Sequence, residues 1–448
     1  MSQTQDAGEA SVSSAALPLG RLEEMVDVTA VARCIVDNVR RSPGERFRVR
    51  KDRADALAAV GHVMPDAFFE LMQPTGAALW REMAATRPSL TPQTLVVDDQ
   101  HAAQLWAAAG RILSPDGVPS HYAPATPAPD AIRVLQLTHY DPGSAVYRYH
   151  AAANTDPGVV SAFARWGYSN PHCHLRQWDG DLHRQTVEFL AMTSDVIHVH
   201  MDYRTLEQDL GYACWPDQRV AITYHGSRIP EETRKSYVDE AADRRHQAIR
   251  FGARPYHARH GIERYLPIPM PIDDYLPLVA KPASGPFRIA HSPTKRAIKG
   301  TGVLLEAIEE LRVLDDCPVE VVLIEDCDHG EALRRKATCH ATFDSFWLGM
   351  QGSGLEGAAM GQPVIAGDPL AAEEAARLNG GQIPWTFADD KATLRATIRR
   401  LAENAMFYRA EAVRVHDYVR RLHDYRAVGA QYATFLREAL GRGPANPL

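Results

Sequence analysis

Two basic side chains, Arg296 and Lys299, stand between a predicted strand and a predicted helix in the C-terminal half of the chain. Phe287 to His291 is a short, largely apolar segment, and Val303 to Leu311 repeats apolar residues at the three-to-four spacing of a helix. Thr301 is predicted to cap the start of that helix, where free N–H groups and the helix dipole favour an anion. A solvated basic loop is the alternative, but the strand–loop–helix context favours a phosphate cradle.

A carboxylate, Glu356, lies in the glycine-rich stretch from Gly352 to Gly367, which follows a buried-type strand at Val319 to Ile324. Its side chain can face ribose hydroxyls, or it can merely complement the dipole of the small-residue helix that it precedes. Gly352 and Gly354 would let backbone amides approach a ligand, or they form only a flexible turn.

Histidines mark the ends of two predicted strands in the middle of the chain. His225 ends a strand and is followed by Gly226 and Ser227, and ligands bind at the carboxyl ends of strands in open parallel sheets. His198 and His200 alternate on another strand, so they share a face. Buried, hydrogen-bonded histidines are the first interpretation of this pair, and packing against a ligand cleft is the second.

A metal site is conceivable at Pro171 to His174, where His172 and His174 would share one side of a strand. A structural zinc ion needs about four ligands at suitable spacing, and no further ligands are evident in the sequence. No metal is predicted.

The composition is that of an ordinary globular protein. The length of 448 residues suggests two to three domains, and a net charge of −7 provides no global field for nucleic acid. Six cysteines in a chain this long indicate reduced thiols. No apolar run could span a bilayer and the N-terminus has no signal-peptide pattern, so a cytoplasmic protein is predicted.

The predicted fold class is α/β, with two Rossmann-like domains facing a cleft and an N-terminal helical extension. The strand at Ile132 to Leu137, the loop with Gly143 and Ser144, and a helix from about Ala145 are typical of the start of a Rossmann-like domain. The expected segments are a disordered tail (1–20), the helical extension (21–114), a Pro-rich linker (115–130), an N-terminal domain (131–280), a C-terminal domain (281–405) and helices that cross back to the N-terminal domain (406–448).

The extension carries concentrated basic charge. Apolar residues at three-to-four spacing from Leu22 to Val39 predict a helix. Arg33 to Arg53 contains eight basic and three acidic residues, a local net charge of +5. A solvated surface is the first interpretation, and a patch that contacts the phosphates of a polyanion is the second.

Four motifs occur in the two predicted domains: Asp195-Val196-Ile197-His198-x-His200, Thr223-x-His225-Gly226-Ser227, Ser292-Pro293-Thr294-x-Arg296-x-x-Lys299-Gly300-Thr301 and Glu356-x-x-x-Met360-Gly361-x-Pro363-Val364. They resemble the motifs of GT-B nucleotide-sugar glycosyltransferases, and more narrowly those of the large retaining, metal-independent family. The resemblance covers about residues 131 to 440. The family usually has a second glutamate eight positions before Glu356, and this chain has Leu348 there.

The resemblance implies roles for individual residues. Arg296 and Lys299 would hold the donor diphosphate, and Glu356 would bind the donor ribose beside Gly352, Ser353, Gly354 and Leu355. His225 would border the donor sugar and the acceptor, and with Arg296 and Lys299 it would carry the catalysis. The residues expected on the acceptor side of the cleft are Gly143, Ser144, His200, Gly226 and Ser227.

The function implied by the resemblance is transfer of a sugar from a nucleoside-diphosphate sugar, with no further cofactor. The acceptor stays open among a glycan, a small molecule and nucleic acid, and so does the oligomeric state. Three alternatives remain: a phage-type DNA-base glycosyltransferase that uses the basic extension, a non-catalytic nucleotide-sugar-binding protein, and a GT-B epimerase, for which no suitable set of carboxylates and histidines is evident.

Overall fold

The structure is a computed structural model that describes residues 121–442, apart from 129, 140, 142–143, 166–186, 188–189, 192, 210–217, 226–237, 263, 277–284, 348, 368–369 and 379–380. It also describes the backbone of five short strands between residues 25 and 65. Several predicted features lie outside the described residues: the tail 1–20, Pro171 to His174, Leu348, Gly143, Gly226 and Ser227.

The N-terminal domain is built on a six-stranded parallel sheet in the order β11-β10-β9-β8-β6-β7. Its strands are β6 (Ile132–Thr138), β7 (Val159–Arg165), β8 (Val196–His200), β9 (Arg219–Tyr224), β10 (Ile249–Gly252) and β11 (Arg264–Tyr265). Its helical segments are α5 (Ala145–Ala153), η3 (Thr205–Asp209), α7 (Glu240–His246), η5 (Pro255–His260) and α8 (Ile272–Tyr275). The strands are apolar on both faces because the sheet is buried on both, as parallel sheets are.

The C-terminal domain has a five-stranded parallel sheet in the order β13-β12-β14-β15-β16. Its strands are β12 (Phe287–His291), β13 (Val319–Leu323), β14 (Ala341–Ser345), β15 (Val364–Ala366) and β16 (Thr386–Phe387). Its helices are α9 (Arg296–Lys299), α10 (Thr301–Leu314), α11 (His329–Ala337), α12 (Gly352–Ala359), α13 (Leu370–Arg377) and α14 (Lys391–Glu403). The predicted fold class of two Rossmann-like α/β domains is confirmed.

Each sheet reverses its strand order at one point, between β6 and β8 in the first domain and between β12 and β14 in the second. In open α/β sheets, ligands bind outside the carboxyl ends of the strands at this switch point. Ser144 follows β6, His200 ends β8, and Lys299 follows β12. The topology therefore places these predicted site residues at the switch points.

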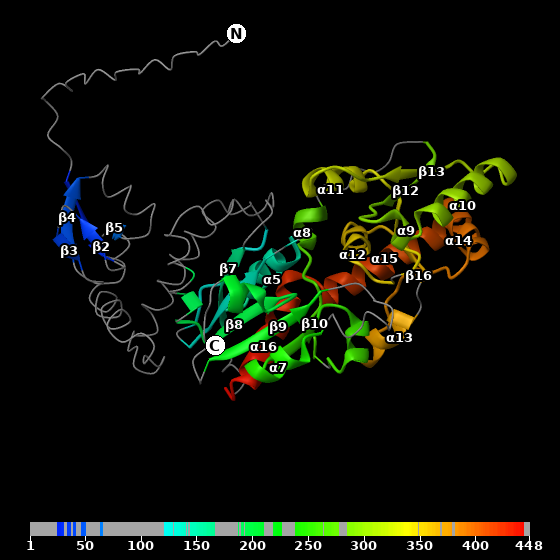
Figure 1. Cartoon of the computed structure of the whole chain (residues 1–448). Coiled ribbons are helices and arrows are strands. Elements are labelled where there is room, and N and C mark those ends of the chain that lie inside the picture. Colours follow the sequence, from blue (N-terminus) through cyan, green and yellow to red (C-terminus); the bar gives the residue numbers. More distant parts are fainter. Residues whose placement is uncertain are drawn as a thin grey trace, which may run out of the picture.

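Two long helices link the domains. α15 (Ala405–Leu422) packs on α12 and α14, whereas α16 (Tyr425–Ala439) packs on α5 (Figure 1). The turn between them is tied to the first domain, because Met270 N donates to His423 O at 2.6 Å. One apolar cluster contains residues of both domains and of α15 and α16, so apolar packing also joins the domains.

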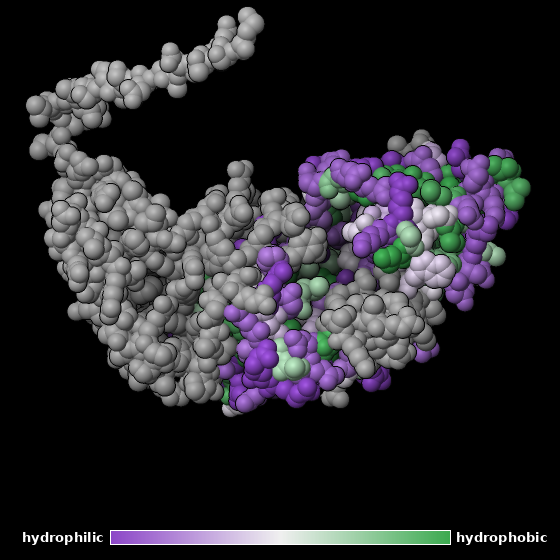
Figure 2. Space-filling model, in the orientation of Figure 1, coloured by the Kyte–Doolittle hydropathy of each residue, from purple (hydrophilic) through white to green (hydrophobic). Residues whose placement is uncertain are grey.

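The visible described surface is mostly hydrophilic, and hydrophobic side chains gather over the C-terminal domain (Figure 2). Val313 and Leu314 at the end of α10 are the most exposed of these after Met406 on α15. Among the described residues, no helix combines the length and apolar composition that a membrane crossing requires.

The helix predicted from Leu22 to Val39 is wrong in the segments that the structure describes. Those segments are the strands β1 (Met25–Ala30), β2 (Cys34–Val36) and β3 (Val39–Arg41), and β1 pairs with β4 (Arg46–Arg50) and β5 (Val63–Pro65). Val26 and Val28 alternate with Asp27 and Thr29, and this period-two pattern of β-branched residues favours a strand.

Candidate functional site

Lys299 ends the four-residue helix α9 at the carboxyl edge of the second sheet. It is 8% exposed, and its ammonium group has no hydrogen-bond or ion-pair partner among the residues that the structure describes. Burial lowers the pKa of Lys299; the Asp344 carboxylate opposes this effect, and the positive charge of Arg254 adds to it. An unpaired buried cation is costly to the fold, and a bound anion would remove that cost.

Arg296, the predicted partner of Lys299, is largely exposed to solvent. Its side chain is 59% exposed and forms an ion pair with Glu325, in which Nε lies 2.9 Å from Oε1. Arg296 is thus ion-paired in this structure, and Glu325 would compete with an anionic ligand for its guanidinium.

The turn that follows Lys299 depends on Gly300. Its φ of 74° lies in the left-handed region, and a Cβ there would be 2.3 Å from Phe346 Cβ. Gly300 is the N-cap of α10, so the predicted cap at Thr301 is wrong. The Thr301 hydroxyl instead lies 2.8 Å from His291 Nε2.

Glu356 lies inside α12 and not before it, and three side chains bind its carboxylate. Arg148 Nη2 and His329 Nε2 each lie 2.9 Å from Oε1, and Lys336 Nζ lies 2.6 Å from Oε2. Burial alone would raise the pKa of Glu356, but the charge of Lys336 and the bonds to His329 and Arg148 hold it well below the usual range. The carboxylate is therefore ionised, and it forms ion pairs with both Arg148 and Lys336.

The Arg148–Glu356 ion pair joins the two domains. Arg148 projects from α5 of the first domain, is 4% exposed, and also donates to Tyr275 OH at 2.9 Å. Sequence reasoning missed Arg148, Lys336 and His329. The available signal for Arg148 was an arginine in the otherwise apolar and aromatic segment Ala145 to Ala153.

The predicted donor-binding residues before Glu356 form the first turn of α12. Ser353 O and Oγ accept from Lys336 Nζ at 3.1 and 3.0 Å. Gly354 packs so closely on Asp344 that a Cβ would lie 2.3 Å from its Oδ2. Gly352 has open space in place of a Cβ, whereas the side chain of Leu355 is fully buried in the core.

The three predicted histidines form a hydrogen-bonded group at the carboxyl edge of the first sheet. His225 Nε2 lies 2.7 Å from His200 Nδ1, and His200 Nε2 lies 2.6 Å from Gln136 Oε1. The His198 ring stacks on His200 with centroids 4.2 Å apart. Burial, aided by the charge of Arg254, lowers the pKa of His225 to about 3, so the ring is neutral at pH 7. His198 and His200 are buried and hydrogen-bonded, as the first interpretation predicted.

The start of α5 is held by a carboxylate that the sequence did not single out. Asp141 Oδ1 and Oδ2 accept from the backbone N–H groups of Val146 and Tyr147 at 2.8 and 3.0 Å. Ser144 is buried with a φ of 58°, in the left-handed region. Asp141 thus fixes the turn before α5. Ser144 is the N-cap residue of this helix, and the resemblance implies that it contacts the acceptor.

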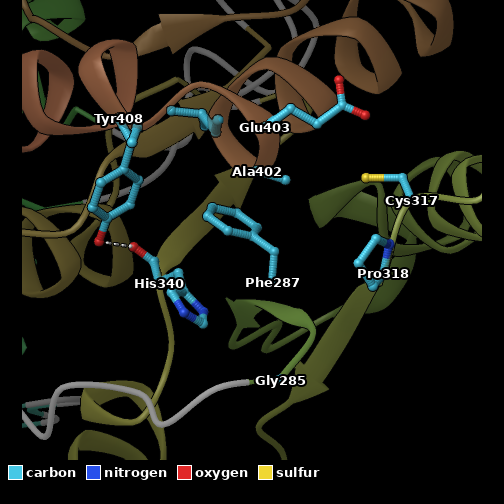
Figure 3. A pocket seen from close by; sticks show the side chains of 10 residues that line it. Gly285, Phe287, Cys317, Pro318, His340, Ala402, Glu403 and Tyr408 are labelled. Carbon is cyan, nitrogen blue, oxygen red and sulfur yellow. Dashed lines mark hydrogen bonds between the residues drawn. The ribbon is translucent and has the colours of Figure 1, made fainter.

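A pocket of about 370 Å³ lies at the other end of the second sheet (Figure 3). It is lined by Phe287, His340 and Tyr408, and Tyr408 OH donates to His340 O at 3.1 Å. Phe287 begins β12, and at ~3.3 Å per residue the strand separates it from His291 by roughly 13 Å. The pocket is therefore distinct from the group around Lys299. Among the described residues, no group of three or more His, Cys, Asp or Glu side chains could hold a metal ion.

No protein-family model and no curated protein sequence matches the chain. Solved structures do match it. A sucrose-phosphate synthase from Thermosynechococcus elongatus is 15% identical, with a TM-score of 0.46, over 69% of this chain and 99% of the other. A glycosyltransferase from Rickettsia africae is 13% identical, with a TM-score of 0.49, over 70% and 100%. An α-glucosyltransferase in complex with UDP and a 13-mer DNA containing an HMU base is 11% identical, with a TM-score of 0.49, over 68% and 99%.

Proposed function

We propose that this protein is a glycosyltransferase that moves a sugar from a nucleoside-diphosphate sugar to an acceptor, by a retaining and metal-independent reaction. The observation that carries the proposal is Lys299, a buried cation at the switch point of the second parallel sheet that forms no ion pair with any described residue. An anionic ligand at this edge would compensate it, and the diphosphate of an activated sugar is such a ligand.

The departing diphosphate needs positive charge as the bond to the sugar breaks. Without a metal, fixed side-chain cations must supply it, and such preorganised charge usually contributes more to catalysis than any other single effect. Lys299 is already in place, and Arg296 would join it when its bond to Glu325 opens. A guanidinium offers a two-pronged contact and an ammonium a point charge, which suits neighbouring phosphate oxygens.

Glu356 is proposed to bind the donor ribose. A ribose hydroxyl can donate to the Glu356 carboxylate, which accepts from Arg148, His329 and Lys336 in this structure. Arg148 has a second partner in Tyr275 OH, so it can release Glu356 without losing all of its hydrogen bonds. Gly352, whose backbone is open on its Cβ side, and Ser353 would lie beside the donor.

His225 is proposed to position the donor sugar as a neutral hydrogen-bonding group. Its Nδ1 atom is buried and has no hydrogen-bond partner among the described residues, whereas Nε2 is hydrogen-bonded to His200. A sugar hydroxyl would satisfy Nδ1. Ser144 and His200 are proposed to line the acceptor side, together with Gly143, Gly226 and Ser227.

The test measures donor binding and turnover separately. Calorimetry with a panel of nucleoside diphosphates should detect binding to the full chain, and Lys299→Met should weaken it by more than about tenfold, as removal of a charge-assisted hydrogen bond does. Lys391→Met, at a lysine paired with Glu310 on the surface, is the control and should bind as the wild type does.

Unchanged binding by Lys299→Met would remove the proposed donor site. Tight binding without transfer or hydrolysis of any nucleoside-diphosphate sugar would instead identify a non-catalytic binding protein. Exchange at a sugar carbon without transfer would indicate an epimerase.

A nucleic-acid acceptor is the second candidate, and the strand β4 favours it. Arg46, Arg48 and Arg50 occupy alternate positions along β4, so these positions share one face of the strand. A row of cations on one strand face is suited to a phosphate backbone.

DNA binding by this face should weaken steeply with salt. Replacing the three arginines by Gln should reduce the slope of log K against log salt by about 0.9 for each phosphate that the variant no longer neutralises. Arg312→Gln, on the exposed side of α10, should leave the slope unchanged. An unchanged slope in the triple variant would exclude this candidate.

A further inference from the structure

Arg254 is a second buried cation at the domain interface, and neither the sequence motifs nor the proposed function uses it. It is 7% exposed, and its Nε and Nη1 atoms are buried without a hydrogen-bond partner. It forms no ion pair with any residue that the structure describes. A guanidinium carries five donors in a rigid fork and stays charged, so burying it unpaired is costly unless a ligand supplies an anion.

The backbone places Arg254 at the carboxyl edge of the first sheet, beside His225. Gly252, at the end of β10, is in register with Tyr224 at the end of β9, and Ala253 N donates to Tyr224 O at 3.0 Å. Arg254 is the next residue and the N-cap of η5, against which α13 of the second domain packs. It therefore lies where the edge of the first sheet meets the second domain.

The charge of Arg254 acts on groups of both domains. It lowers the pKa of His225 in the first domain, and it adds to the lowering of the pKa of Lys299 in the second. Asp344 is the carboxylate on which Arg254 and Lys299 both act, but its Oδ1 atom is buried without a hydrogen-bond partner and its Oδ2 atom accepts from Gln351 N at 2.6 Å. Arg254 and Lys299 thus act on one carboxylate, and neither forms an ion pair with it or with another described residue.

We propose that Arg254 and Lys299 bind one oxyanion between them, so that a phosphate or carboxylate group of a ligand is held from both domains at once. The proposal rests on the proposed function only for the identity of that ligand. The oxyanion is either the diphosphate of the donor or an acidic group on the acceptor. In both cases Arg254 supplies the two-pronged contact that the exposed Arg296 does not provide in this structure.

The experiment uses the full chain and three variants: Arg254→Met, Arg254→Lys and, as a matched control, Arg244→Met at an exposed arginine of α7. Thermal unfolding is followed in anion-free buffer and then with inorganic pyrophosphate, inorganic phosphate and nucleoside diphosphates. Without an anion, Arg254→Met should unfold at a higher temperature than the wild type, because it removes an uncompensated buried charge. A purely structural arginine would give the opposite shift.

With pyrophosphate, the wild type and Arg244→Met should gain stability together, and Arg254→Met should bind about 10- to 100-fold more weakly. Arg254→Lys should be intermediate because it keeps the charge and loses the fork. A lower unfolding temperature for Arg254→Met, or anion binding equal to that of the wild type, would overturn the proposal, as would a wild type that binds none of these anions.

Two further arms identify the source of the oxyanion. Equal losses of nucleoside-diphosphate and pyrophosphate binding in Arg254→Met assign the oxyanion to the donor. Normal nucleoside-diphosphate binding, with loss of phosphate binding to the nucleotide-loaded protein, assigns it to the acceptor. If the wild type binds pyrophosphate but no nucleoside diphosphate, the proposed function fails while the role of Arg254 is still decided.

Discussion

Two groups of buried charge lie between the domains, and they differ in whether their charges form ion pairs. Around Glu356, one carboxylate accepts from Arg148, His329 and Lys336 at 2.6 to 2.9 Å. Around Lys299, two cations from different domains have no ion-pair partner among the described residues, and the nearby carboxylate of Asp344 pairs with neither. Both groups contain two cations and one carboxylate, but only the cations of the first group are ion-paired.

This difference indicates that the group around Glu356 holds the domains together, whereas the group around Lys299 is suited to bind an anionic ligand. An ion-paired buried cluster loses stability when its carboxylate is removed, because the remaining cations are left unpaired. A buried cation without an ion-pair partner should instead destabilise the ligand-free protein, so replacing it by an apolar side chain should raise stability and weaken only ligand binding. Substitutions in the two groups should therefore shift stability in opposite directions.

Glu356→Gln should give the largest effect and destabilise the protein by about 3–5 kcal/mol, because it leaves Lys336 and Arg148 buried without a counter-charge. Denaturant unfolding of the full chain measures the change. Glu306→Gln, at an exposed glutamate paired with Lys391, is the control and should change little. Wild-type stability in Glu356→Gln would show that the cluster does not hold the domains.

Lys299→Met should act in the other direction. Replacing the buried ammonium by an apolar side chain of similar length should stabilise the ligand-free protein by about 1–2 kcal/mol, since an unpaired charge no longer has to be desolvated. Unfolding midpoints with and without a nucleoside diphosphate measure both parts of the effect: the variant should gain stability alone and lose the stabilisation by ligand. A destabilised Lys299→Met would contradict the division into paired and unpaired groups.

The histidines add a pH dependence that falls in a different range from that of Glu356. Burial lowers the pKa of His225 to about 3 and that of His291 and His423 to about 4. In the unfolded chain these histidines bind protons near pH 6.5, whereas in the folded protein they bind them only near pH 3 to 4. The free energy of unfolding is therefore highest above pH 6.5. It falls as the pH drops toward 4, by about 1.4 kcal/mol per pH unit for each histidine.

The depressed pKa of Glu356 makes its contribution fall only below about pH 4.5, the ordinary value for a glutamate. Stability measured from pH 7.5 to 5 therefore reports the histidines without a contribution from Glu356. His225→Gln keeps a donor for His200 and should reduce the slope by one proton. An unchanged slope would mean that His225 takes up its proton in the folded state.

The fold of residues 131 to 440 could be predicted because local patterns determine it. Strands that are buried on both faces are largely apolar runs, such as Ile132 to Leu137. Helices such as Thr301 to Leu314 repeat apolar residues at three-to-four spacing. The same reasoning predicted a helix in the N-terminal extension where the structure has strands. From Met25 to Ala30 a three-to-four spacing and a two-residue alternation coexist, and the β-branched residues favour the strand that forms.

The site was predicted only in part, because its charges come from distant segments. Lys299 and Glu356 were found from motifs, but Arg148 is 208 residues from Glu356 in the sequence. Arg254 lies in none of the recognised motifs. Its position at the domain interface is evident only from the packing of η5 against α13. Sequence spacing can show that a cation follows a strand, but not whether another side chain already neutralises it, as Glu325 does for Arg296.

Arg296→Gln should have the smallest effect on stability and on ligand binding. It tests whether Arg296 or Lys299 is the principal diphosphate contact. The Arg296 side chain is exposed and bonded to Glu325, so removing its charge should leave the unfolding midpoint within error of the wild type. Binding of a nucleoside diphosphate should weaken only a few-fold. In the wild type, breaking the Arg296–Glu325 bond costs part of the binding free energy that a contact between Arg296 and a phosphate would contribute. Glu325→Gln frees Arg296 and should tighten the same binding. If Arg296→Gln abolished binding while Lys299→Met did not, the exposed arginine would be the principal diphosphate contact, and the buried unpaired charge would need another ligand.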